Sequence, residues 1–483
     1  MPFPCALGID VGTTNSKVVL VEFTPAASVR ARATAPTSAA DAFGPALADL
    51  VRAVLADRPA PDAVGIASMA ETGVPLDADG APLGDWLRWD GHRAGAEADE
   101  LADRLGRDQL IAATGVRPSA KVPLATWAWL RGQRPELFAA MVRWAGVADL
   151  ACLLLTGRLA TDHTLAGRTM AYRLPADGPS ATQFDADLTA EVGLRPDQLP
   201  DVVCADIAGP VRAPAFVDAG IPSGTPVSVA GHDHAVGAYA AGVRLPGQVA
   251  DSVGTAEAVF TVVETPPDPR EVAAAGMSSV VTVDAAHRAL LAGSPGAGAF
   301  VQWWLENEAR AWSPAPLFAA VQVLDAKPSE VIVLPYLHGR QAPAPDPAAR
   351  VQIIGRAEHS AAELAHAMLQ GLCLHARWLF DEQARLAGAP ATEPVIALGG
   401  PLVANPAWSR LKALVTPQPV CLVTEPEAVA VGAALLSAAR AGLVDAADTV
   451  LDQQPIAEGT QHRGEYEQAL AAFVAAALQE GST

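Results

Sequence analysis

The sequence alternates between short apolar runs and longer segments whose apolar residues recur every three or four positions. The short runs are rich in valine and isoleucine, which is typical of buried strands; they lie at residues 5–9, 18–21, 62–71, 225–231, 330–335, 394–400 and 419–424. Helical spacing is found at residues 45–57, 124–142, 149–157, 361–388 and 428–442. Strands that alternate with helices predict an α/β protein.

Two segments share one layout: a strand, a tight turn and a second strand. The first is residues 5–23, and the second is residues 247–263, where the turn again contains Val-Gly-Thr. Such a recurrence indicates a duplicated unit, with one copy opening each half of the chain. We therefore predict two large domains, residues 1–244 and 245–445, followed by a helical tail at 446–483.

Two other segments allow predictions about exposure: one is expected at the surface, and the other is expected to be buried. Residues 339–350 are rich in proline, so we expect a surface loop there. Residues 428–442 form the most apolar long segment, but they are mostly alanine and include Arg440. This composition predicts a buried helix rather than a membrane span.

Composition narrows the class of protein. With 483 residues, 51% of them hydrophobic and 18% charged, the chain is long enough for two packed cores and too apolar for disorder. Its net charge of -20 argues against nucleic acid or an anionic membrane as partner. The five cysteines are scattered, and the first residues lack a signal-peptide pattern. We therefore expect a cytoplasmic protein with reduced thiols.

The turn Gly12–Asn15 is a candidate anion site. It is not a P-loop, because the G-x-x-x-x-G-K-[ST] pattern is absent and the turn leads into a strand. Its backbone N–H groups, its hydroxyls and Lys17 could still hold a polyphosphate. Asp10, at the end of the first strand, could hold Mg²⁺ through water. An ordinary hairpin is the alternative.

A second candidate follows the strand at 394–400. The paired glycines Gly399 and Gly400 would let the backbone approach a flat ligand such as an adenine ring. Glu425 and Glu427 lie at the start of the next helix. The glycine pair and the segment with Glu425 and Glu427, each taken alone, also fit an ordinary strand-to-helix turn.

The segment Gly-His-Asp-His at 231–234 allows three interpretations: a metal site, a catalytic carboxylate with polar neighbours, or a polar turn. The metal interpretation needs further ligands at a recognisable spacing, and the remaining histidines are dispersed without an H-E-x-x-H pattern. Zinc is therefore disfavoured, which leaves a catalytic carboxylate and a polar turn as the open interpretations.

Taken in order, these motifs resemble the FGGY carbohydrate kinases. The resemblance rests on GIDVGTT-x-S-K, G-H-D, S-V-G-T, L-G-G and E-x-x-A-V-G-A-A, and covers about residues 5 to 440. Three other segments are similar to the family: LRWDGHR (87–93), DLACLLLTGRLATDHTLAG (149–167) and LPYLHGRQAPAPDPAAR (334–350). The resemblance implies two duplicated actin-like (ribonuclease H-like) ATPase domains, with a nucleotide and sugar cleft between them.

It also implies ATP-dependent phosphorylation of a hydroxyl of a small sugar or polyol, with Mg²⁺ and with Asp233 as catalytic base. The residues that match the family's site are, for ATP and phosphate, Gly12, Thr13, Thr14, Asn15, Lys17, Gly254, Thr255, Gly399, Gly400 and Asn405; for the substrate, Glu71, Thr72, Asp90, Asp233 and His234; and for the metal, Asp10 through water together with Asp233.

The sequence departs from the family at two points. Pro401 stands where a third glycine is common, which affects the backbone near the nucleotide. The segment SMAETG (68–73) resembles the R-E-T of glycerol kinases, but Ala70 replaces the arginine. The substrate therefore stays open among pentuloses, polyols and aldonates, and family resemblance leaves a homodimer open.

Three rival functions use the same fold. A catalytically inactive nucleotide or sugar sensor is the main alternative, although Asp10, Lys17, Asp233 and Thr255 are all retained. A chaperone would need a separate peptide-binding domain. A repressor-related sugar kinase would need a cysteine-rich zinc motif, which is absent from the sequence.

Overall fold

The computed structural model describes residues 3–24, 27–175, 180–356, 358–388, 393–447, 449–456 and 462–479. The chain divides into two compact units. The first comprises Met1–Gly242, Ser279–Arg288 and Glu427–Leu451, and the second comprises Val243–Ser278, Ala289–Pro426 and Asp452–Thr483. Of the predicted tail, residues 448, 457–461 and 480–483 lie outside the described residues.

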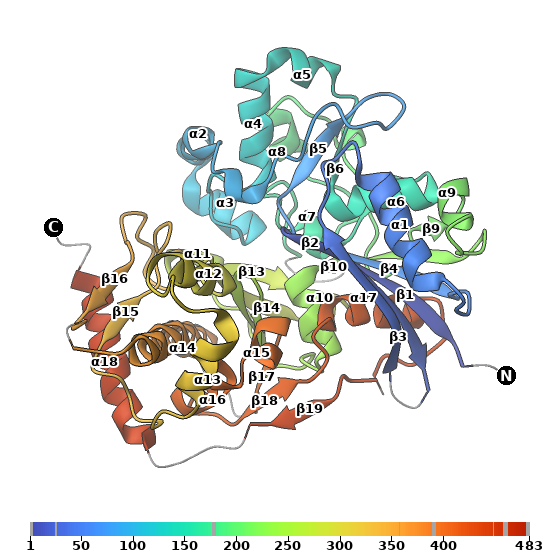
Figure 1. Cartoon of the computed structure of the whole chain (residues 1–483). Helices are drawn as coiled ribbons and strands as arrows, with labels where there is room; N and C mark the ends of the chain where they lie inside the picture. The colour runs from blue at the N-terminus through green and yellow to red at the C-terminus, as the bar shows by residue number, and fades with distance from the viewer. Residues whose placement is uncertain are drawn as a thin grey trace. The chain divides into compact units, whose positions relative to one another are not determined.

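The first unit contains a six-stranded sheet in the order β3-β2-β1-β4-β10-β9 (Figure 1). The strands are β1 (Cys5–Val11), β2 (Asn15–Phe23), β3 (Ala27–Pro36), β4 (Ala63–Ser68), β9 (Gly209–Pro210) and β10 (Pro226–His232). β1 pairs antiparallel with β2 and parallel with β4, and β4 pairs parallel with β10. The central strands β1 and β4 are buried along their whole length, as expected for strands covered on both faces.

The second unit contains a seven-stranded sheet in the order β13-β14-β12-β11-β17-β18-β19. The strands are β11 (Val249–Val253), β12 (Glu257–Val263), β13 (Ser278–Val281), β14 (Arg288–Ser294), β17 (Val395–Leu398), β18 (Val420–Val423) and β19 (Gln453–Pro455). β11 pairs antiparallel with β12 and parallel with β17, and β17 pairs parallel with β18. Both sheets thus repeat one pairing scheme, which confirms the predicted α/β class and the duplication.

Helices surround both sheets. Those of the first unit are α1 (Phe43–Leu55), α2 (Gly95–Leu105), α3 (Arg107–Thr114), α4 (Pro123–Gln133), α5 (Pro135–Ala140), α6 (Val147–Thr156), α7 (His163–Ala166), α8 (Ala186–Glu191), α9 (Pro214–Val217), α10 (Asp233–Ala240) and α17 (Ala428–Arg440). Those of the second are α11 (Pro269–Ala274), α12 (Gly298–Asn307), α13 (Pro314–Gln322), α14 (Ala361–Ala387), α15 (Gly400–Ala404), α16 (Pro406–Val415) and α18 (Arg463–Gln479). Three small ladders complete the structure: β5 (Gly73–Leu76) with β6 (Arg143–Gly146), β7 (Ala160–Thr161) with β8 (Asp201–Val202), and β15 (Ile332–Leu334) with β16 (Gln352–Ile354).

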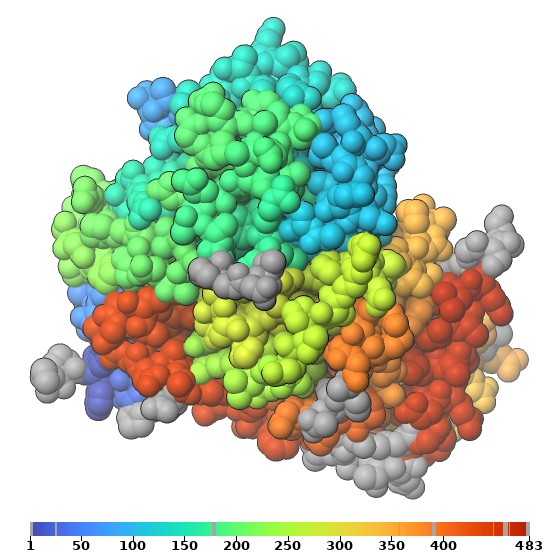
Figure 2. All heavy atoms as spheres, turned by 180° about the vertical axis from the view of Figure 1, so that it is seen from behind, coloured from blue at the N-terminus to red at the C-terminus, as the bar shows by residue number. Residues whose placement is uncertain are grey.

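Helix α17 belongs to the first unit although it comes late in the sequence. It packs on β1, β4 and β10. Seen from behind, the orange-red surface around the end of this late segment lies beside the blue and green surface of the first unit (Figure 2). A Cβ on Gly8 would lie 1.9 Å from the carbonyl oxygen of Ala430, and one on Gly65 would lie 1.8 Å from that of Ala433. The helix backbone therefore sits directly on the sheet, where no side chain fits.

One local prediction was wrong, and another holds only in part. The predicted helix at 124–142 is two helices, α4 and α5, because Pro135 disfavours a helical conformation at Arg134. The loop at 339–350 is only partly on the surface: Pro347, Ala348 and Arg350 are exposed, whereas the part around Arg340 is buried. Arg340 is 5% exposed, donates hydrogen bonds to the carbonyls of Pro343, Ala344 and Ala477, and so fills the loop's interior.

The segment at 428–442 is a buried helix, as predicted. Across the part of the chain that the structure describes, none of the helices combines the length and apolar character that crossing a membrane requires.

Candidate active site

Asp233 lies where β10 ends and α10 begins. It is the first residue of α10, so its carboxylate sits at a helix N-terminus, which stabilises negative charge. Its Oδ1 accepts a hydrogen bond from the backbone N–H of His234 at 2.7 Å. The side chain is 21% exposed, so a ligand can reach it from solvent.

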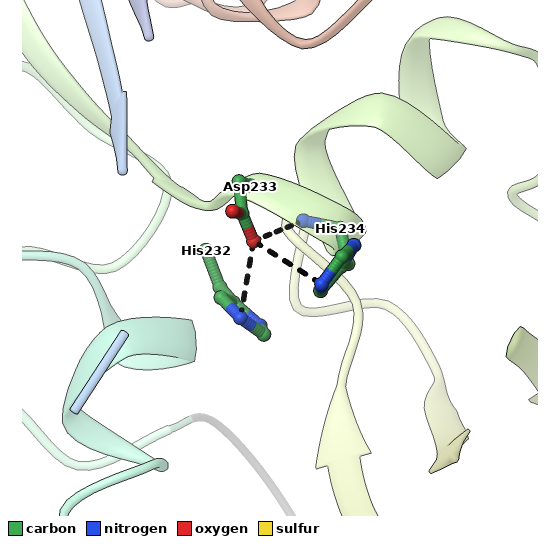
Figure 3. Close-up of side chains that lie close together, drawn as sticks. All are labelled: His232, Asp233 and His234. Atoms are coloured by element: carbon green, nitrogen blue, oxygen red, sulfur yellow. Dashed lines mark hydrogen bonds and ion pairs between the residues drawn. The ribbon is translucent and has the colours of Figure 1, made fainter. Parts of the chain in front are cut away.

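Two histidine rings flank the same oxygen (Figure 3). His232 Nε2 lies 3.2 Å and His234 Nε2 lies 3.8 Å from Asp233 Oδ1. Burial lowers the pKa of His232 well below its usual value, and the charges of His234, Arg168 and Lys121 act in the same direction. The His232 ring is therefore neutral at physiological pH. The contacts to the side chains shown in the figure all involve Oδ1, which leaves Oδ2 available to a ligand.

The same three residues are also compact enough to bind a metal ion. One ligand atom from each of His232, Asp233 and His234 lies within 4.8 Å of the others, and no fourth ligand joins them among the described residues. Three protein ligands suffice for an open zinc site. A zinc ion bound directly by all three side chains would occupy the carboxylate that a base needs, so a direct zinc site and a general base at Asp233 exclude each other.

A buried network holds the end of β10. Asp162 Oδ1 accepts hydrogen bonds from the backbone N–H and the hydroxyl of Thr164, at 2.8 and 2.6 Å. Thr164 Oγ1 in turn accepts from the backbone N–H of His232 at 2.9 Å. Arg440 of α17 donates to the carbonyl of Val229 at 2.8 Å, just before the register of β10 against β4 shifts. These bonds fix an irregular strand end that the sheet alone would not define.

The first glycine-threonine turn joins β1 to β2. The backbone N–H of Gly12 donates to the carbonyl of Asn15 at 3.0 Å, and Thr37 contributes two bonds: its hydroxyl to the carbonyl of Gly12 and its N–H to that of Thr14. The side chain of Thr14 is exposed. The turn is therefore held from behind, which keeps its shape without a ligand.

Trp89 links this turn to the predicted substrate residues. Its Nε1 donates to the Thr13 hydroxyl at 3.0 Å, and its backbone N–H donates to the Thr72 hydroxyl at 3.1 Å. Asp90, the next residue, is exposed and forms two hydrogen bonds with Arg88, at 3.0 and 2.9 Å. Thr13 and Thr72 are thus brought together, while Asp90 is paired with its neighbour.

Asp10 and Lys17 form a charged group with Glu427. Lys17 Nζ lies 2.7 Å from Glu427 Oε2 and 4.0 Å from Asp10 Oδ2. Burial raises the pKa of Asp10 to about 7, against the effect of Lys17, and the negative charges of Asp233 and Glu427 raise it further. Burial lowers the pKa of Lys17, but the two carboxylates outweigh that effect and raise it. Lys17 is therefore the fixed cation of this group.

The carboxylate of Asp10 fits a hard cation. Its Oδ1 is buried and has no hydrogen-bond partner among the described residues. A buried carboxylate oxygen without a partner is unfavourable unless something else binds it. Carboxylate oxygens are the ligands that Mg²⁺ prefers, and Asp233 lies within electrostatic range.

Glu71 lies between two cations that the sequence analysis did not assign to the site. Arg168 Nη2 is 2.7 Å from Glu71 Oε1, and Lys121 Nζ is 3.6 Å from Glu71 Oε2. Burial raises the pKa of Glu71, but Lys121 and Arg168 outweigh it and hold the pKa below its ordinary value. The backbone of Glu71 has a φ of 68°, a strained conformation for a residue with a side chain. The only signal in the sequence was that Lys121 is one of four lysines.

In the second unit, the predicted nucleotide residues form two turns. Thr255 is exposed, and the carbonyls of Gly254 and Thr255 accept hydrogen bonds from the first residues of α12. Gly399 has a φ of 123°, and a Cβ there would lie 1.9 Å from the carbonyl oxygen of Val253. The strand-end glycine therefore lets β17 lie directly beside the second glycine-threonine turn. Gly400 faces open space.

Two other polar side chains of the second unit have structural partners. Asn405 is buried, and its side chain accepts the backbone N–H of Trp408, so it caps α16. Lys412, also on α16, is 1% exposed and pairs with Asp251 and Glu257 in the β11–β12 hairpin. Burial raises the pKa of Glu257, and the ammonium group of Lys412 offsets part of that rise.

Comparison with known proteins identifies the family. Residues 5–240 match the N-terminal domain, and residues 249–441 the C-terminal domain, of the FGGY family of carbohydrate kinases. A xylulose kinase from Streptomyces coelicolor is 31% identical over 283 residues, 55% of this chain and 56% of the relative. A gluconokinase from Bacillus subtilis is 21% identical over 92% of this chain and 89% of the relative.

Solved structures agree on the fold. A protein described as a xyloylose kinase from Brucella ovis superposes with a TM-score of 0.86 at 21% identity, and covers 99% of both chains. Glycerol kinase from Plasmodium falciparum with ADP gives a TM-score of 0.82 at 16% identity, again over 99% of both chains. The predicted family is confirmed: the chain belongs to the FGGY family of carbohydrate kinases, ATP-dependent phosphotransferases that act on an alcohol group.

Proposed function

We propose that this kinase phosphorylates a hydroxyl of a small sugar, polyol or sugar acid and that Asp233 is its general base. The observation that carries the proposal is the environment of Asp233: a carboxylate at a strand end and helix N-terminus, with Oδ1 occupied by the His234 N–H and Oδ2 available. A base must be oriented by its neighbours and still present a free oxygen to the substrate.

In the proposed step, Asp233 accepts the proton of the attacking hydroxyl. The oxygen of that hydroxyl forms a bond to the γ-phosphorus of ATP, and the bond from the γ-phosphorus to the β–γ bridging oxygen breaks. The products are ADP and the phosphorylated carbohydrate. His232 stays neutral, so it orients the carboxylate without competing for the proton.

The turn Gly12–Asn15 and Lys17 are proposed to bind phosphate oxygens, and Asp10, with Asp233 nearby, to hold Mg²⁺. When bound, Mg²⁺ would neutralise negative charge on the phosphates. Gly254, Thr255, Gly399 and Gly400 are proposed to bind the nucleotide in the second unit. The hydrogen bonds of Asn405 point instead to a structural part in shaping that turn.

The test is an ADP-release screen across ketoses, polyols and sugar acids, with background ATPase activity subtracted. Wild-type protein is expected to turn over at least one of them, and Asp233→Asn to lose about 10²- to 10⁴-fold in kcat, the usual effect of removing a general base. Carbohydrate binding, measured by thermal shift, should remain. Equal turnover by the two proteins would exclude Asp233 as base, and no turnover of any compound would favour the sensor.

Metal analysis separates the base from a zinc site at His232–His234. We expect purified protein to hold no stoichiometric zinc and to keep its activity after chelation and Mg²⁺ replacement. One zinc per chain, lost together with activity in a His234→Ala variant, would contradict the proposed base.

A further inference from the structure

The cluster around Glu71 contains more positive charge than the fold needs. Arg168 and Lys121 both pair with Glu71. Burial lowers the pKa of Lys121 despite Glu71, and the nearby charges of Arg168 and Arg117 lower it further. The side chain of Arg117 has neither an ion pair nor a hydrogen bond among the described residues. Two cations thus share the single carboxylate of Glu71, which leaves one positive charge uncompensated there, in a chain whose net charge is -20.

Arg168 and Lys121 also have hydrogen-bond donors that no described residue accepts. Arg168 is 5% exposed, and its Nη1 is buried without a hydrogen-bond partner among the described residues. An unpaired guanidinium donor in a buried place is costly, and a ligand oxygen would satisfy it. Within the described chain, Lys121 forms one ion pair, the 3.6 Å contact with Glu71, and its side chain is 20% exposed. Its ammonium group carries three donors, so most of its capacity is free.

The cluster borders the proposed base. Arg168 and Lys121 both act on the pKa of His232, and His232 Nε2 contacts Asp233 Oδ1 at 3.2 Å. His232 therefore separates the cations from the base by about one side chain. A small molecule that places one hydroxyl at Asp233 would extend its other end towards Arg168 and Lys121.

We infer that Lys121 and Arg168 form a carboxylate-binding subsite and that the preferred substrate is a polyhydroxy acid, an aldonate, rather than a neutral polyol or ketose. This inference rests on the proposed function of the same site. Arg168 Nη1 donates to one carboxylate oxygen and Lys121 Nζ to the other, while Glu71 keeps the two cations in place. Charge-assisted bonds of this kind are among the strongest in proteins.

The test compares matched pairs that differ only in the acid: xylonate with xylitol, ribonate with ribitol, and gluconate with glucitol. Each pair is measured by ADP release and by thermal shift, with sugar phosphates as a third arm. The variants are Lys121→Met, which leaves Glu71 paired with Arg168, and the conservative Lys121→Arg. Lys327→Met, at an exposed lysine of the second unit, is the matched control.

We expect at least one acid to have a higher kcat/KM than its alditol. Lys121→Met should lower the ratio of the two kcat/KM values by about 10- to 100-fold, the usual effect of losing a charged hydrogen bond. Lys121→Arg should restore most of that ratio, and Lys327→Met should leave it unchanged. Because a general loss of folding affects both members of a pair equally, the ratio reports the subsite.

Each other outcome is decisive. A preference for alditols, ketoses or sugar phosphates, or a ratio unchanged in Lys121→Met, would overturn the inference while leaving the kinase proposal intact. Acids that stabilise the wild type but not Lys121→Met, without any turnover, would support the subsite and contradict the proposed function. If acids neither bind nor react, the subsite is excluded.

Discussion

Asp10 should make the first unit less stable as pH rises through neutrality, and Asp10→Asn should remove that effect. The folded-state pKa of Asp10 is about 7, against an ordinary value of 3.8. Between these values the unfolded chain has released the proton and the folded chain still holds it. Stability therefore falls with rising pH over this window, and the full cost is present above pH 7.

The magnitude follows from the size of the shift. Each pKa unit corresponds to about 1.4 kcal/mol, so the rise of about three units makes the ionised carboxylate cost ~4 kcal/mol of unfolding free energy. Roughly two of those units lie between pH 5 and pH 7. The stability of Asp10→Asn relative to wild type should therefore improve by about 2.5–3 kcal/mol between pH 5 and pH 8.5.

The assay is urea-dependent hydrogen exchange of the amides of β1 and β4, which reports the first unit alone. Wild type and variant are compared at both pH values, with and without Mg²⁺. If Asp10 holds the cation, Mg²⁺ should stabilise the wild type more at pH 8.5 than at pH 5 and should not do so in the variant. A stability difference that does not change with pH would refute the reasoning, because Asp10 would then not titrate near neutrality.

Three further predictions concern packing and charge. Gly65→Ala should lower the free energy of unfolding by several kcal/mol, because the new Cβ would lie 1.8 Å from the carbonyl oxygen of Ala433. Gly132→Ala, at an open position of α4, should raise that free energy by up to about 1 kcal/mol. Similar melting temperatures for the two variants would contradict this prediction. Lys412→Met should lower the free energy of unfolding by about 3–5 kcal/mol, because the carboxylates of Asp251 and Glu257 would stay buried without a cation. An unchanged urea midpoint would show that these two carboxylates are not charged. Lys17→Ala should raise the KM for ATP by about tenfold or more and leave carbohydrate binding unchanged; an unaltered ATP dependence would count against a phosphate contact.

Local patterns were enough to predict most of the fold. Helical spacing predicts a helix over 361–388, and α14 spans Ala361–Ala387 with Gly388 after it in the left-handed conformation. The two hairpins and the buried helix at 428–442 were also predicted, because periodicity and turn residues are properties of neighbouring positions. Pro135 could have been interpreted as a helix break from the sequence alone, since its effect is equally local.

The contacts around the candidate site could not be predicted from the sequence. Arg168 and Glu71 are 97 residues apart, and Arg440 and Val229 are 211 apart, so no spacing rule connects them. The buried part of the loop, around Arg340, was missed because a proline-rich composition does not reveal that one guanidinium satisfies three carbonyls from inside. The sequence did identify Asp233 and the residues of the two glycine-threonine turns as candidates, and their roles stay predictions.

The late position of α17 has a consequence for how the protein is made. The strands of the first sheet are complete once His232 has been synthesised, but the helix that covers β1, β4 and β10 begins at Ala428. At translation rates of about 5–20 residues per second, the roughly two hundred intervening residues take about 10–40 s. During that time the first unit emerges from the ribosome with the apolar sheet face that α17 covers still open, while most of the second unit is synthesised. The first unit should therefore need protection by a chaperone in the cell, and a chain shortened before residue 428 should aggregate even though its sheet is intact.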